Sequence, residues 1–128
     1  MAHISYSELK IWAECPFKHK LMYIDKIKGF IGNEYTAFGG AIHSLCESAV
    51  VGALSEDDYE DFFQNSFRDE LKKIEVTKPS LVMEMLEQAN NISPNILPAL
   101  DKHFGEYEVV SVEERLFEDI QNHKFSFP

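Results

Sequence analysis

The sequence lacks the features of a secreted, membrane-spanning or disulfide-linked protein. It has two cysteines, Cys15 and Cys46, and they fit neither a disulfide framework nor a four-ligand metal site. No apolar run approaches the roughly 20 residues that a membrane span needs. The first residues also lack the basic and apolar regions of a signal peptide. We therefore expect a cytoplasmic protein with reduced thiols and no membrane partner.

An excess of positive charge is also missing. The formal net charge is −10, which argues against a protein that coats nucleic acid by charge alone. The distribution is uneven, however, because residues 1–30 contain five lysines and only three acidic residues. These lysines are either the solvated face of a helix or contacts for phosphate, and composition does not decide between the two.

The chain has 128 residues, 45% of them apolar, which is enough for one domain with its own core. Ser5 and Glu8 form a capping box at the start of a first helix, and Pro16 should break that helix into two short ones. Apolar residues then recur at the three- and four-residue spacing of helices. After a loop at 27–36, this spacing predicts helices over 37–53, 55–75, 79–90 and 93–105.

The pattern changes to that of β-strands after residue 105. Valines at 109, 110 and 112, followed by apolar residues at 116, 117 and 120, predict a first strand. A turn at 121–123 follows, and residues 124–127 begin a second strand. We expect an α+β fold that is mostly helical, with a helical part over 1–105 and the start of a core sheet, a hairpin, over 106–128. A lone hairpin is marginal in water, so this single domain should be incomplete.

Three local motifs occur in a fixed order along the chain. A serine-rich helix leads to Cys15 and Pro16, a Gly-x-x-x-His element runs from Gly39 to His43, and acidic residues follow the predicted first strand. In this order they resemble the N-terminal part of RecB-like nucleases, a branch of the PD-(D/E)XK superfamily that includes phage exonucleases and CRISPR adaptation nucleases. The resemblance covers residues 4–127 and implies N-terminal helices followed by the first strands of a restriction-endonuclease-like core.

The resemblance implies a site for a catalytic divalent metal, magnesium or manganese, with His43 as a ligand. Glu47 lies four residues later on the same helix face, as an outer partner of the imidazole or a further metal-facing group. Glu113 or Glu114 would be the catalytic acid; a one-residue slip exchanges them, and we prefer Glu113. On the residues alone, the alternative is that His43 is a half-buried helix histidine paired with Glu47, and that both glutamates are ordinary exposed strand residues.

The resemblance also suggests residues that contact DNA. These are Lys10, Lys18, Lys20, Tyr6, Gly39 and Gly40. Tyr6 and the neighbouring aromatic residues are alternatively core residues of amphipathic helices. Cys15 matches the first cysteine of members that hold an iron–sulfur cluster, but two cysteines cannot supply four thiolates, so we expect no cluster.

The sequence departs from the family at the residues that cut DNA. The Gly-x-x-Asp motif and the later acid and lysine of the family are not found in these 128 residues. We therefore expect a chain that neither cuts DNA nor binds metal tightly by itself, and whose site is completed by a C-terminal nuclease segment. A strand-adding protein is the other partner that we expect. The alternative is a catalytically inactive, nuclease-derived module that binds a protein or DNA partner.

Overall fold

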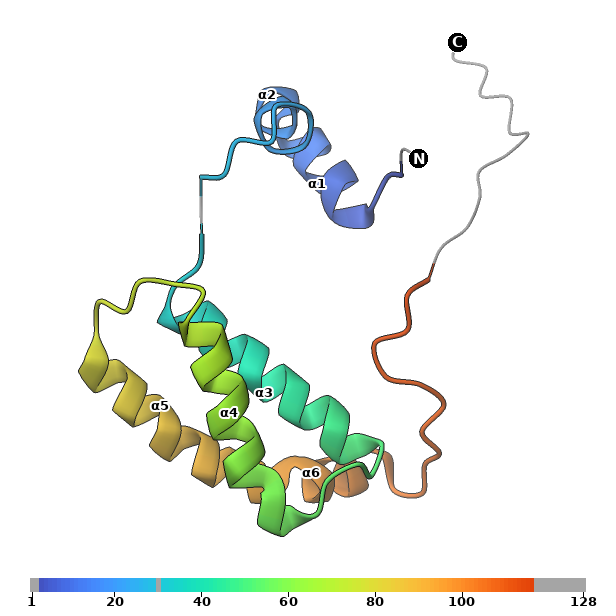
Figure 1. Cartoon of the computed structure of the whole chain (residues 1–128). Helices are drawn as coiled ribbons and strands as arrows, with labels where there is room; N and C mark the ends of the chain where they lie inside the picture. Colours follow the sequence, from blue (N-terminus) through green and yellow to red (C-terminus); the bar gives the residue numbers. More distant parts are fainter. Residues whose placement is uncertain (1–2, 30, 117–128) are drawn as a thin grey trace.

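The computed structural model describes residues 3–29 and 31–116, which form helices joined by irregular segments (Figure 1). The elements are α1 (Tyr6–Glu14), α2 (Pro16–His19), the π-helical turn η1 (Lys20–Ile24), α3 (Glu34–Val50), the 3-10 turn η2 (Glu56–Asp58), α4 (Tyr59–Leu71), α5 (Pro79–Ile92), the 3-10 turn η3 (Ser93–Asn95) and α6 (Ile96–Phe104). No helix in the described part of the chain is long and apolar enough to cross a membrane.

The predicted helices are confirmed, with shifts at their ends. The break at Pro16 is present, because α1 ends at Glu14 and α2 begins at Pro16. Helix α3 begins at Glu34 instead of Ala37, since a capping box precedes it: the Asn33 side chain accepts from the Thr36 N–H, and the Thr36 hydroxyl accepts from the Asn33 N–H. This cap lies inside the segment that was predicted to be a loop.

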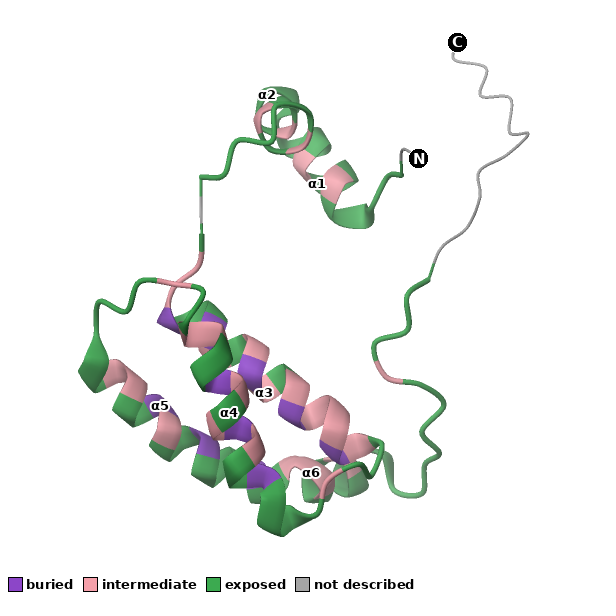
Figure 2. Cartoon of the chain, in the orientation of Figure 1, coloured by how far each residue is buried: buried purple, intermediate pink, exposed green. Residues whose placement is uncertain are grey.

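The hydrophobic core lies between α3, α4 and α5 (Figure 2). Helix α3 contributes small residues and one leucine, and α4 contributes large aromatic ones. Phe38 packs edge-on against Phe63 and Phe67, with ring centroids 5.8 Å and 6.0 Å apart. The buried apolar residues are Ala37, Ala41, Leu45 and Ala49 on α3, Tyr59, Phe63 and Phe67 on α4, and Met85 and Ala89 on α5. This packing fixes the orientation of α3, which carries the candidate site.

A buried carboxylate fastens the start of α3 to the segment before α5. Glu34 is 4% exposed, and its Oε1 accepts hydrogen bonds from the backbone N–H groups of Thr77 and Lys78 at 2.8 Å and 2.9 Å. Hydrogen bonds from backbone N–H groups, its own and those of Lys78 and Thr77, lower the pKa of Glu34 from its ordinary 4.5 to about 2. The ionised form therefore holds the loop between α4 and α5.

The prediction of an α+β fold with first strands of a core sheet is wrong for the described residues. These contain no strand, and 106–116 follow an irregular path with bends at 105–106 and 112–113. Gly105 and Glu113 have positive φ angles of 68° and 48°, which interrupt an extended chain. The β-branched residues between them have no strand beside them in the described part of the chain, and unpaired strands are not stable. The rest of the predicted hairpin, 117–128, lies outside the described residues.

Candidate metal centre

Helix α3 presents His43 and Glu47 on one face. The two residues are one turn apart, and His43 Nε2 lies 2.7 Å from Glu47 Oε1. Ala41 and Leu45, on either side of His43 in sequence, are fully buried against the core, so the imidazole points outward. The His43 side chain is 57% exposed, which leaves it accessible to solvent and ligands.

Glu113 reaches the same histidine from the irregular segment that follows α6. Its Oε1 lies 2.9 Å from His43 Nε2, so the carboxylates of Glu47 and Glu113 meet the same ring nitrogen. Glu113 has a φ of 48°, in the left-handed region that non-glycine residues seldom adopt. Such backbone strain is common where a side chain is held for function, and here the bend directs the carboxylate to α3.

The three side chains have the donor types and spacing of a divalent metal site. One imidazole nitrogen and two carboxylate oxygens lie within 4.8 Å of one another. In an octahedral site with ligands at about 2.1 Å, adjacent ligand atoms are about 3.0 Å apart. The distances of 2.7 Å and 2.9 Å from Nε2 are close to this separation. The residues therefore fit magnesium or manganese, with the exposed side left for water or phosphate.

Glu114, the other candidate acid, is directed elsewhere. The Ser111 hydroxyl donates to Glu114 Oε2 at 3.0 Å. The bend at 112–113 thus separates the two neighbouring glutamates, and it brings Glu113 to His43. The irregular backbone, instead of strand alternation, decides which glutamate joins the group.

The two glycines before His43 have different surroundings. A Cβ at Gly40 would lie 3.4 Å from the carboxyl carbon of Glu70 on α4, so this glycine permits close packing of α3 on α4. At Gly39 a Cβ would meet nothing within 4 Å. Of the two, only Gly39 lies on an open surface where a ligand has room.

The other expected DNA-binding residues lie on α1, α2 and η1, which Figure 1 shows apart from α3, the helix that carries His43. Tyr6 is 82% exposed. Two of the lysines have acidic neighbours: Lys18 Nζ is 3.9 Å from Glu14, and Lys20 Nζ is 3.0 Å from Asp25. Lys10 is exposed on α1. The described structure therefore does not gather these residues with the His43 group into one surface.

Sequence reasoning missed a hydrogen bond between side chains on the two sides of Pro16. Glu8 Oε1 lies 2.8 Å from His19 Nε2, and the His19 ring stacks on Tyr23. The predicted capping box at Ser5 is half present: the Ser5 hydroxyl accepts from the Glu8 N–H, while the Glu8 side chain turns to His19. Because this pair joins two helices around a corner, no local spacing rule could have identified it.

The two cysteines are free thiols in different surroundings. Cys15 is exposed at the junction of α1 and α2, and Cys46 is half-buried on α3. Burial raises the pKa of the Cys46 thiol. Cys46 therefore has the character of a packing residue.

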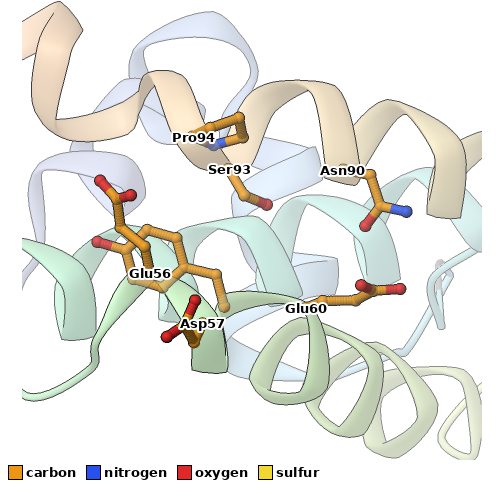
Figure 3. A pocket seen from close by; sticks show the side chains of 7 residues that line it. Glu56, Asp57, Glu60, Asn90, Ser93 and Pro94 are labelled. Atoms are coloured by element: carbon orange, nitrogen blue, oxygen red, sulfur yellow. The ribbon is translucent and has the colours of Figure 1, made fainter.

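An acidic hollow lies between the start of α4 and the end of α5 (Figure 3). It has a volume of about 420 Å³, and its charged groups are the carboxylates of Glu56, Asp57 and Glu60. Asn90 and Ser93 line the opposite side, and the Ser93 hydroxyl donates to the carbonyl of Ala89. Negative charge of this density disfavours phosphate, so the hollow is not a nucleic-acid site.

Comparison with known proteins identifies the family of the chain. The family model described as the PD-(D/E)XK nuclease superfamily matches residues 3–124. No curated protein and no solved structure matches significantly. The matched range contains α3 and the segment that bears Glu113, so it includes all three residues of the candidate metal centre.

Proposed function

Because the chain belongs to the PD-(D/E)XK nuclease superfamily, we propose that it is part of a metal-dependent DNA nuclease whose metal is bound by His43, Glu47 and Glu113. Members of this superfamily generally use magnesium or manganese. The proposal is supported by one observation above all: two residues of α3 and one residue from a distant segment direct ligand atoms to a common point. Imidazole with carboxylates is a donor set that manganese accepts readily.

Each residue has a separate task in this proposal. His43 binds as neutral imidazole through Nε2, the atom that faces both carboxylates. Glu47 also lies beside Nε2, the nitrogen that would bind the metal, so we assign it as a further metal ligand. A residue that only orients the imidazole would instead accept a hydrogen bond from the other ring nitrogen, Nδ1. Glu113 supplies the second carboxylate and ties the segment after α6 to α3. A bound divalent metal would stabilise charge on the scissile phosphate and activate the attacking water.

We further propose that His43, Glu47 and Glu113 form part of an active site of the RecB-like branch of the superfamily. Its support is the order of motifs, from Cys15-Pro16 to Gly39 and His43. The acid and lysine with which this family completes the site are not found in the sequence. We propose that a C-terminal nuclease segment supplies them, and that these 128 residues alone do not hydrolyse DNA.

Metal binding is the first test, because it needs no second segment. Manganese titrated into the full chain and followed by electron paramagnetic resonance should show a weak site. His43→Ala and Glu113→Gln should each lower the affinity by more than about tenfold, since loss of an outer partner alone costs 10- to 100-fold. His103→Ala and Glu114→Gln are matched controls, because His103 lies on α6 and Glu114 pairs with Ser111.

Equal affinities in all five proteins would remove the metal centre from the proposal. Cleavage of DNA is then measured with the chain alone and mixed with a segment that bears the family's acid and lysine. Cutting only in the mixture, and none with His43→Ala, is the expected result. DNA or protein binding that is indifferent to metal and to His43 would instead favour a catalytically inactive binding module.

A further inference from the structure

The N-terminal unit, defined here as α1, α2 and η1, exposes an unusual amount of apolar surface. None of its residues is buried, as Figure 2 shows. A nine-residue helix and a four-residue helix are too short to persist without a surface to pack on. Eight large apolar side chains in and beside the unit are at least 46% exposed: Ile4, Tyr6, Leu9, Trp12, Phe17, Met22, Ile24 and Ile27.

A groove on this unit gathers part of the apolar surface. It has a volume of about 490 Å³ and is lined by Ile4, Leu9 and Trp12 together with Glu8 and His19. The hydrogen bond between Glu8 and His19, at 2.8 Å, is largely shielded from solvent, with side chains 20% and 15% exposed. The lining is therefore held in place by a contact between α1 and α2. A preformed apolar groove of this kind is typical of a docking site.

We propose that residues 117–128 of this same chain cover the groove. The segment has four large apolar residues, Phe117, Ile120, Phe125 and Phe127. Its formal charge is −1, from Glu118 and Asp119 against Lys124, whereas residues 3–29 contain five lysines against three acidic residues and sum to +2, so the two charges are opposite in sign. The family match spans 3–124 and thus includes both the groove and most of the segment in one family domain.

The path of the preceding residues supports this occupant. In Figure 1, residues 105–116 leave the bundle and run toward the end of the molecule where α1 and α2 lie. Their apolar residues are also uncovered, with Val110 90% and Leu116 85% exposed. Twelve further residues reach up to about 40 Å when extended, and α1 is only about 13 Å long. The segment is therefore long enough to lie along the whole unit.

Trp12 is the only tryptophan of the chain, so its fluorescence reports directly on the groove. In the full-length chain we expect short-wavelength emission and resistance to acrylamide quenching. The double variant Phe117→Asp, Ile120→Asp should shift the emission to longer wavelength and remove this protection, while circular dichroism confirms that the helices of the bundle remain. Met83→Asp is the control, because Met83 is 66% exposed on α5.

Three results would overturn the proposal. Trp12 that is quenched as easily as a free tryptophan derivative would mean that the groove is open. Protection that grows with protein concentration would assign the groove to a second copy of the chain. Protection that appears only when single-stranded DNA is added would assign it to the nucleic acid. None of these readouts depends on metal or cleavage, so they are independent of the proposed nuclease function.

A cross-linking experiment keeps the proposal testable if the double variant does not fold. Cys15 is an exposed thiol on the unit, and Cys46→Ser removes the other one. In that background, Ile120→Cys should form an intramolecular link to Cys15 with a short bifunctional thiol reagent at low protein concentration. Met83→Cys should link much less. Equal yields from the two positions would contradict docking of the segment.

Discussion

Phe63→Ala should be among the most destabilising single changes in the chain. Phe63 is 1% exposed at the contact of α3 and α4, and its ring packs against Phe38 and Phe67. Truncation of a buried phenylalanine to alanine costs about 3–5 kcal/mol, because the transfer energy is lost and a cavity remains. A domain of this size has about 5–15 kcal/mol of stability, so the variant should be close to unfolding.

Urea denaturation followed by circular dichroism measures this loss. With a slope of about 2 kcal/mol per molar urea, a loss of about 4 kcal/mol moves the midpoint down by about 2 M. Phe104→Ala is the matched control, because Phe104 is 60% exposed on α6 and its truncation should change stability by only about 0.5 kcal/mol. If the two variants shift the midpoint equally, the core does not lie between α3 and α4. The same loss of packing should weaken manganese binding, because α3 carries His43 and Glu47.

Three further changes test single contacts. Glu34 has an ordinary pKa of 4.5 and a folded-state pKa of about 2, so the wild-type protein should lose stability as the pH falls from 4.5 toward 2 and Glu34 becomes protonated. Glu34→Gln should be less stable than the wild type at neutral pH and should lose less stability over that pH range. Acid titration followed by circular dichroism measures both effects. Asn33→Ala should cost about 1 kcal/mol in urea denaturation, because it removes the cap of α3. Gly105→Ala should lower the stability measured by urea denaturation, because the φ of 68° at the end of α6 is strained for alanine. Gly52 also has a positive φ and open space around it, so Gly52→Ala should lower the stability for the same reason at a position outside α6.

The helices could be predicted because their signals are local. Pro16 has no N–H to donate and breaks the first helix whatever surrounds it, and the aromatic residues of α4 recur at helical spacing. The start of α3 was placed too late because Asn33 and Thr36 act as a cap only together, within a segment whose glycines favour a loop. The strand prediction failed because β-branched residues make a strand only when a neighbouring strand is present.

Only part of the candidate site could be predicted from the sequence. His43 and Glu47 lie one helical turn apart, so their proximity follows from the helix itself. The approach of Glu113 depends on a bend with a positive φ, which no residue pattern at 112–114 indicates. The role of Glu34 was not predicted, because Glu34 lies in the segment expected to be a loop and its partners Thr77 and Lys78 are distant in sequence.

The proposed metal would join two segments of the chain that are far apart in sequence, and a chelator could break this link by removing the ion. His43 and Glu113 are 70 positions apart, so an ion bound to both would close a loop that includes α4, α5 and α6. A ligand that binds only the folded chain adds about 2.7 kcal/mol of stability at a hundredfold excess over its dissociation constant. The chain would then melt at a temperature that rises with manganese and falls with a chelator, and the ion would serve the architecture of the bundle as well as its chemistry.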